Sequence, residues 1–176
     1  ATAAFDFCGI SEGIGCDVCA QVCPRLNPRE FELADLLYGS DQPYNGAFGV
    51  YRRVVAARTV APEIKDRAQD GGVVTAMLRW ALERGVIDGA AVSVADPTRP
   101  AQPMPKLVTD VGELMTSAGS WYTYCPNNLA LENAERFGLE KVAFVGVPCQ
   151  ITPVRKMQLV DAGYLHQCDR RRAGGA

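Results

Sequence analysis

Histidine is nearly absent from this sequence, since its 176 residues include only His166. Serine and cysteine hydrolases rely on a histidine beside the nucleophile, and many catalytic zinc sites contain histidine ligands. The sequence therefore disfavours both kinds of chemistry. If the protein is an enzyme, a bound cofactor is expected to carry the reaction.

Long apolar runs and excess positive charge are also absent. No run approaches the ~20 residues that cross a bilayer, and the N-terminus lacks the basic and apolar regions of a secretory signal. The net charge of −2 gives no basic field for nucleic acid or an anionic membrane. We expect a cytoplasmic protein with no nucleic-acid partner and no membrane span. In that reducing compartment the seven cysteines are expected to be metal ligands or redox groups rather than disulfides.

Helical and strand patterns alternate after residue 49. The residues Val74, Met77, Leu78, Ala81 and Leu82 fall on one helical face. Asp70 is placed to cap this helix and Gly85 to end it. Four prolines within residues 96–105 indicate a surface loop. The expected strands cover 50–59, 89–95 and 141–146, and the expected helices cover 31–38, 70–85, 109–119 and 127–138. The pattern predicts an α/β fold with a mixed sheet flanked by helices, preceded by a small cysteine-rich, ferredoxin-like segment.

The N-terminal segment holds four cysteines: Cys8, Cys16, Cys19 and Cys23. From Cys16 the run C-x2-C-x3-C-P is the second half of the bacterial ferredoxin motif, whose thiolates hold an iron–sulfur cluster. Seven residues separate Cys8 from Cys16 instead of the usual two, so Cys8 is a candidate fourth ligand. A structural zinc site normally uses two separated C-x2-C pairs. The pattern favours a [4Fe-4S] cluster, with zinc or unliganded thiols as alternatives.

Two further stretches have the character of binding loops. "QDGGVVTAML" puts Gly71 and Gly72 at a helix start, where free backbone N–H groups can bind an anion, and Thr75 adds a hydroxyl. The pair matches neither a P-loop nor a G-x-G-x-x-G fingerprint, so a helix start without a ligand is the alternative. "SAGSWYTYCPNN" combines small polar and aromatic residues. Such a loop can lie along a flat ring, or it can pack onto the core.

Several blocks together resemble one known family. "EIKDRAQDGGVVTAML", "GVIDGAAVSV", "SAGSWYTYCPNN" and "GLEKVAFVGVPCQITPVRKMQ" occur in this order between about residues 50 and 158. They are similar to the beta subunits of coenzyme F420 hydrogenases and dehydrogenases. Members of that family bind FAD and iron–sulfur centres and exchange electrons with the deazaflavin coenzyme F420. The resemblance implies an iron–sulfur segment and linker over 1–48, a flavin-binding α/β domain over 49–160, and a tail, or a point of truncation, over 161–176.

The resemblance also implies roles for individual residues. Cys149 of "VGVPCQ", expected at the end of the strand 141–146, would ligate a cluster beside the flavin. The implied cofactor contacts are Gly71, Gly72, Val73, Thr75, Ser120, Tyr122, Thr123, Asn127, Pro148 and Gln150. Cys8, Cys16, Cys19 and Cys23 would correspond to the ferredoxin-like lead of several members.

These features lead to one functional hypothesis. A partner would deliver electrons to a [4Fe-4S] cluster, and FAD would pass them to coenzyme F420 as substrate. The expected partners are hydrogenase or dehydrogenase subunits of a larger complex, for example those of formate dehydrogenase. A flavin is needed because clusters move single electrons whereas a deazaflavin takes two. One alternative is a related module with another acceptor, of the sulfite reductase, glutamate synthase or chlorophyllide reductase type. The other is a non-enzymatic, metal-stapled interaction domain.

Overall fold

The computed structural model describes residues 21–43 and 45–159. The chain divides into two compact units, one comprising Ala1–Val50 with Thr152–Ala176 and the other Tyr51–Ile151. The boundary falls inside helix α7 (Pro148–Leu159). None of the helices in the described ranges is both long and apolar enough to cross a membrane.

In the first unit, helix α2 (Glu30–Tyr38) lies where the sequence predicted a helix. Two acidic residues occupy its first turn, where the helix dipole favours negative charge, and Gly39 follows its last residue with a φ of 89°. The nearly buried Lys156 of α7 donates a hydrogen bond to the main-chain oxygen of Asn27. This bond ties α7 to the turn that follows Cys23, whose own carbonyl accepts from the Asn27 N–H at 3.0 Å.

The second unit is built on a three-stranded mixed sheet, which confirms the predicted α/β class with a mixed sheet flanked by helices. The ferredoxin-like character of the N-terminal segment stays a prediction. Strand β1 (Gly89–Ala95) lies in the centre. It pairs antiparallel with β2 (Pro103–Val108) and parallel with β3 (Val142–Phe144). β1 and β3 fall within the strands expected from the sequence.

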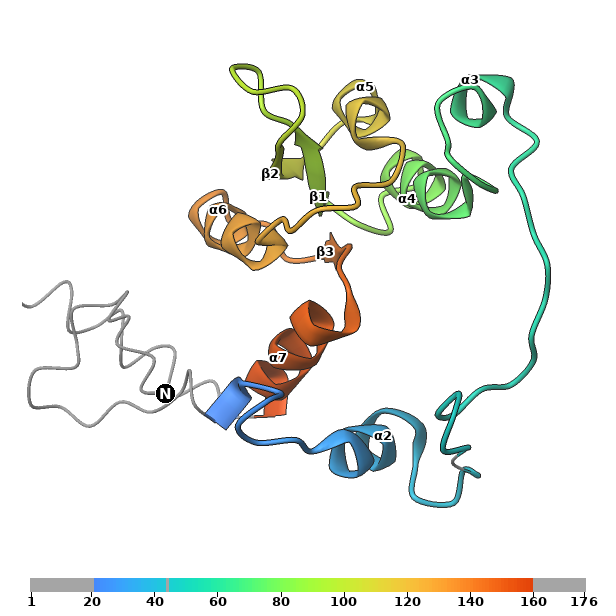
Figure 1. Ribbon diagram of the computed structural model, residues 1–176, viewed down its shortest axis with the longest axis vertical. Coiled ribbons are helices and arrows are strands. Elements are labelled where there is room, and N and C mark those ends of the chain that lie inside the picture. The colour runs from blue at the N-terminus through green and yellow to red at the C-terminus, as the bar shows by residue number, and fades with distance from the viewer. Residues whose placement is uncertain (1–20, 44, 160–176) are drawn as a thin grey trace, which may run out of the picture. The chain divides into compact units, whose positions relative to one another are not determined.

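Helices cover both faces of this sheet (Figure 1). Helices α4 (Val73–Glu83) and α5 (Val111–Leu114) pack on one face, and α6 (Ala130–Arg136) lies on the other. The short elements are α3 (Pro62–Lys65), η1 (Met115–Ser117) and η2 (Asn127–Leu129). The core cluster consists of Ala90, Val92, Val94, Val108 and Leu114, with Leu78 and Leu82 of α4 packed against it. Alternate residues of β1 thus point to α4 and α5, and those between them point to α6.

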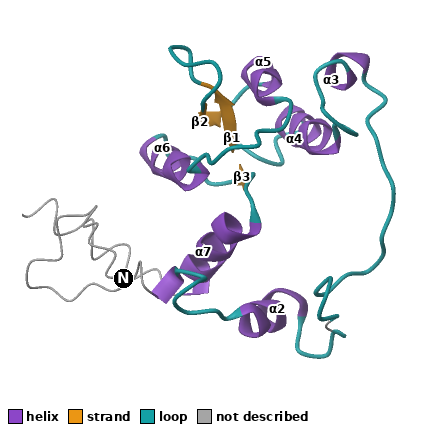
Figure 2. Ribbon diagram, viewed as in Figure 1, coloured by secondary structure: helices purple, strands orange, loops and turns teal. Residues whose placement is uncertain are grey.

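Several elements differ from the sequence prediction, and two of these differences concern strands. Residues 51–61 are drawn as loop in Figure 2, so the strand predicted over 50–59 is wrong. Val54 and Val55 in this loop are largely exposed, because β-branched residues form a strand only where a partner strand and a surface to pack on exist. The surface loop predicted over 96–105 is wrong at its end, where β2 begins at Pro103. β2 is an edge strand, which tolerates proline because alternate N–H groups point away from the sheet.

Candidate functional site

A cavity of about 470 Å³ opens beside the parallel strands β1 and β3 of the second unit. The Val145 N–H still bonds the Ala91 oxygen at 3.0 Å, and the chain then turns away at Gly146. Val92 and Ser93 of β1 are left facing the cavity. Ligands of open α/β sheets bind in this kind of place, outside the carboxyl ends of parallel strands.

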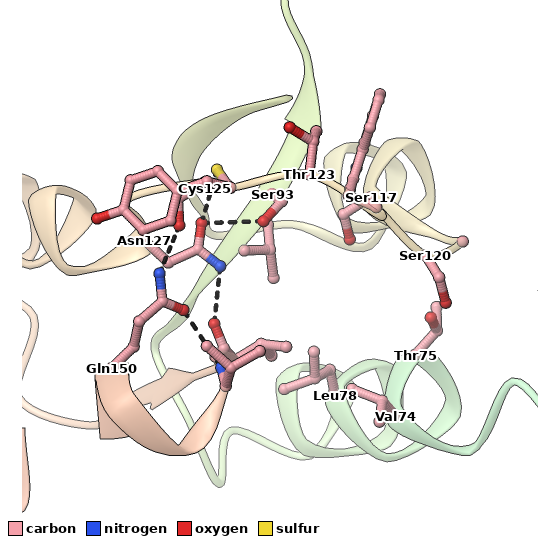
Figure 3. A pocket seen from close by; sticks show the side chains of 17 residues that line it. Val74, Thr75, Leu78, Ser93, Ser117, Ser120, Thr123, Cys125, Asn127 and Gln150 are labelled. Atoms are coloured by element: carbon pink, nitrogen blue, oxygen red, sulfur yellow. Dashed lines mark hydrogen bonds between the residues drawn. The ribbon is translucent and has the colours of Figure 1, made fainter. Parts of the chain in front are cut away.

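Side chains from five segments line this cavity (Figure 3). Asn127 and Gln150 lie on one side, Thr75 and Ser120 lie opposite, and Leu78 lies on the α4 side. The lining residues are Val74, Thr75, Leu78, Val92, Ser93, Ser117, Gly119, Ser120, Trp121, Thr123, Tyr124, Cys125, Asn127, Val145, Gly146, Val147 and Gln150. The wall therefore combines apolar side chains from the core with hydroxyl and amide groups, as small-molecule sites commonly do.

A second cavity of about 280 Å³ adjoins the first at the start of α4. Gly71, Gly72, Val73, Thr75 and Ser120, all predicted cofactor contacts, are among its lining residues. The two cavities share their lining along one edge, through Val74, Thr75, Gly119 and Ser120. A ligand that is longer than one cavity can therefore extend along α4 into the other.

The start of α4 is shaped by the glycine pair. Gly72 is the N-cap with a φ of 64°, so the predicted cap at Asp70 is wrong. A Cβ on Gly71 would lie 2.6 Å from the main-chain oxygen of Ala57, and the Gly71 oxygen accepts from the Thr59 N–H at 2.7 Å. No side chain caps the helix. Its first-turn N–H groups have no acceptor within the helix and can bind an anionic group.

The polar side of the larger cavity is a connected set of hydrogen bonds (Figure 3). The Asn127 Oδ1 accepts from the Ser93 hydroxyl at 2.9 Å and from the Cys125 thiol at 3.1 Å. The Asn127 Nδ2 donates to the Val145 oxygen at 2.8 Å. Gln150 accepts from the Val147 N–H at 3.2 Å and donates to the Cys125 oxygen. These bonds join β1, the loop before η2, the end of β3 and the start of α7.

Three predicted site residues do not line either cavity. The Tyr122 ring is exposed, and its hydroxyl accepts a hydrogen bond from the Gln69 amide. Pro148 and Cys149 are exposed in the first turn of α7. The prediction that Cys149 ends a strand is therefore wrong, because β3 stops at Phe144 and Cys149 begins a helix.

Of the four predicted N-terminal ligands, only Cys23 lies in the described part of the chain. Cys8, Cys16 and Cys19 fall outside the described residues. Cys23 is half-buried, and the main-chain N–H groups of Leu26 and then Arg25 lower the pKa of its thiol. A lowered pKa favours the thiolate, which is the form that binds metal. Within residues 21–43 and 45–159, no group of three or more potential metal ligands comes together.

Ser93 and Gly146 are site residues that the sequence analysis did not single out. Ser93 is the only polar side chain in the otherwise apolar strand 89–95, and that pattern could have marked it. Gly146 could not have been assigned locally. A Cβ there would lie 2.7 Å from a ring carbon of Phe144 and 2.9 Å from the Gln150 Oε1, so this glycine makes room for the Gln150 side chain.

Comparison with known proteins assigns the chain to a family. Residues 54–132 match the family described as "Coenzyme F420 hydrogenase/dehydrogenase, beta subunit N-term". The coenzyme F420 hydrogenase subunit beta of Methanothermobacter thermautotrophicus is 40% identical over 124 residues, which are 69% of this chain and 43% of that protein. The chain belongs to the coenzyme F420 hydrogenase/dehydrogenase beta-subunit family. The family resemblance noted in the sequence is thereby confirmed.

The names of further relatives refer to different enzymes, a sulfite reductase and a hydrogenase complex. A coenzyme F420-dependent sulfite reductase of Methanocaldococcus jannaschii is 33% identical over 160 residues, covering 91% of this chain and 23% of that protein. Among solved structures, a chain of the F420-reducing [NiFe] hydrogenase complex from Methanosarcina barkeri superposes with a TM-score of 0.63 at 39% identity, covering 66% of this chain and 40% of that one. The relatives are oxidoreductases by name, which confirms the predicted enzyme class for the family. The chain spans less than half the length of these relatives.

Proposed function

We propose that this chain is the flavin-binding, electron-transferring part of an F420-linked beta subunit. It would receive electrons through a [4Fe-4S] cluster from a hydrogenase, dehydrogenase or similar partner in a larger complex and deliver them, through FAD, to coenzyme F420. The observation that carries this proposal is the pair of adjoining cavities along α4, one ending at an uncapped helix start and the other at a wall of oriented amides.

The residues present suit FAD on three counts. The larger cavity is within the ~300–1,000 Å³ range typical of small-molecule sites. The first turn of α4 offers N–H groups to a pyrophosphate, and Gly71 and Gly72 line the adjoining smaller cavity. Apolar and aromatic groups, including Leu78 and Trp121, are available to a flat ring in the larger cavity. When bound, the flavin would supply the exchange between single electrons and a hydride.

Six of the ten predicted cofactor residues then have a physical task. Gly71, Gly72 and Val73 would present main-chain N–H groups to phosphate oxygens, and Thr75 would add its hydroxyl at the shared edge of the cavities. Ser120 and Thr123 would bind polar atoms of the ring or its side chain from the opposite segment. The core packing beneath Leu78 would keep water from that side of the ring.

The cluster would be held by Cys8, Cys16, Cys19 and Cys23. The lowered pKa of the Cys23 thiol supports this, because it raises the fraction of thiolate, the form that binds iron, at any given pH. Cys149 is an exposed thiol outside the cavity lining, and we retain it as a candidate ligand of a second cluster. Iron and sulfide contents of about four per chain would fit one cluster, and about eight would fit two.

A different acceptor is the second candidate. The sulfite reductase relative aligns with 91% of this chain, more than the 69% for the Methanothermobacter beta subunit. The chain could therefore feed electrons to a fused or bound sulfite reductase. Reduced viologen would separate the two: loss of the visible absorption band of oxidised F420 supports the first candidate, and failure to reduce F420 despite a reducible flavin supports the second.

Protection of Cys125 tests whether FAD occupies the larger cavity. Cys125 lines this cavity, which gives a reagent access to a residue that is otherwise buried, at 7% exposure. A small alkylating reagent should therefore modify Cys125 in flavin-free protein and should modify it several-fold more slowly when FAD is bound, as measured by peptide mass spectrometry. Cys149, exposed and outside the lining, is the internal control whose labelling should not depend on FAD. Equal labelling of Cys125 with and without bound FAD would contradict the proposed site.

A further inference from the structure

The hydrogen bonds of Asn127 leave one orientation for its side-chain amide. A main-chain oxygen can only accept, so the amide atom 2.8 Å from the Val145 oxygen must be the NH2 nitrogen. The Oδ1 is then turned to Ser93 and Cys125, whose hydroxyl and thiol must both donate to it. Asn127 is 4% exposed, so these protein groups rather than bulk solvent set its orientation.

Backbone groups orient Gln150 in the same way. The Val147 N–H can only donate, so it faces the Oε1 at 3.2 Å. The Cys125 oxygen can only accept, so it faces the Nε2. Gln150 is 7% exposed, and its own carbonyl accepts from the Asn128 amide at 3.1 Å, which holds this turn of α7 against η2.

Each amide retains one hydrogen-bond donor. An NH2 group carries two hydrogens, and the bonds to Val145 and Cys125 use one on each side chain. In the described part of the chain, neither second hydrogen has an acceptor, and both residues line the larger cavity. The Asn127 Oδ1, by contrast, accepts from two protein donors, and the Gln150 Oε1 accepts from one.

We infer that Ser93 and Cys125 are positioning residues that make this wall of the cavity a hydrogen-bond donor, so that it selects a flat ring whose edge carries acceptor atoms. Together with the Val145 oxygen, their two donors fix the Asn127 oxygen away from the ligand, and its NH2 group then faces ring oxygens or nitrogens. The inference rests on the proposed function, because the ring edge of FAD supplies such carbonyl and ring-nitrogen acceptors.

The donor wall has a consequence for redox chemistry. Reduction of a flavin places negative charge on the acceptor edge of its ring, and oriented donors in a partly buried site stabilise that charge more than water does. The wall should therefore raise the reduction potential of bound flavin. A residue that only shaped the cavity would change affinity without this electronic effect.

The test compares two double variants of the full, flavin-loaded chain. Ser93→Ala with Cys125→Ala removes both donors to Asn127. Ser93→Thr with Cys125→Ser retains a hydrogen-bond donor at each position, in both cases a hydroxyl. We expect the first to bind FAD about tenfold more weakly, as for loss of one well-formed hydrogen bond, and to give the bound flavin a more negative midpoint potential. The second should retain most of the affinity and the potential. If the first double variant does not fold, its two single alanine variants are judged by the same two measurements.

Two results would overturn the inference. One is the same affinity and potential in the alanine and hydroxyl variants. The other is weaker binding with an unchanged potential, which would make the bonds a matter of cavity shape alone. Failure of the unaltered chain to bind FAD would instead remove the proposed function, and the inference would fall with it.

Discussion

The two ends of helix α4 provide a matched pair of substitutions that tests how the candidate site is built. Gly72 at its start and Gly85 just beyond its end have almost the same left-handed backbone, with φ of 64° and 62°. A Cβ on Gly72 would lie 3.0 Å from side-chain carbons of Thr59, Ile64 and Ala68, whereas a Cβ on Gly85 would have nothing within 4 Å. Gly72→Ala therefore adds crowding to the backbone cost, and Gly85→Ala isolates that cost.

The magnitudes follow from these surroundings. A left-handed backbone costs an alanine about 1–2 kcal/mol relative to glycine, so Gly85→Ala should destabilise the protein by that amount. Crowding in a packed region costs typically ~1–3 kcal/mol more, and Ile64, at 1% exposure, has little room to move. We expect Gly72→Ala to destabilise by roughly 2–5 kcal/mol, or to displace the 57–72 segment and relieve the crowding at the expense of the adjoining cavity.

Chemical unfolding followed by tryptophan fluorescence measures this difference. The chain has two tryptophans, and both Trp80 and Trp121 lie in the α/β unit, so the signal reports on that unit. FAD titration of each variant supplies the second measurement: Gly72→Ala should lose FAD affinity, and Gly85→Ala should keep it. Equal destabilisation of the two variants with equal FAD binding would refute the reasoning that the glycine pair is required by close packing around the site.

Three further predictions concern the core, an ion pair and a candidate ligand. Leu114→Ala, at a fully buried core position, should lower the unfolding free energy by about 2–5 kcal/mol in chemical denaturation. The pKa of Glu63 is lowered by its own main-chain N–H and by Arg79, so the stability that it contributes is present at neutral pH and is lost as the pH falls through its folded-state pKa. The unfolding midpoint of Glu63→Gln should accordingly vary less with pH in the acid range than that of the unaltered chain. If Cys149 ligates a cluster, its alkylation should rise when a chelator removes iron, and unchanged alkylation would exclude that role.

The sequence predicted those elements whose signals are local. Helix α4 has an apolar face, with Gly72 just before its start and Gly85 just beyond its end. Strand β1 is an apolar run broken only by Ser93. The strand predicted over 50–59 failed because β propensity is a property of the surface on which a strand packs. β2 was missed because Pro103 and Pro105 signal a break, and only the edge position, set by the order of the whole sheet, makes them acceptable.

The residues of the candidate site were likewise only partly predictable from the sequence. The glycine pair and Ser120 were predicted as contacts of one cofactor, and all three residues line the smaller cavity, although no local pattern brings the segments 71–75 and 119–120 together. Asn127 and Gln150 were named as cofactor contacts, and the structure gives their amides protein partners that fix their direction. Those partners include the main-chain groups of Val145 and Val147, two ordinary apolar residues that no side-chain motif marks.

The shortness of β3 is what creates the larger cavity. With three residues it pairs with Gly89, Ala90 and Ala91, and one more bond joins Val145 to Ala91. Had the strand continued for two residues, it would have lain alongside Val92 and Ser93 and covered them. Gly146 ends it by admitting the Gln150 side chain into space that any Cβ would fill, and Gln150 then bonds back to the Cys125 carbonyl. The "VGVPCQ" segment is therefore explained less by its cysteine than by its glycine and glutamine, which together stop a strand, begin a helix and close one side of the cavity.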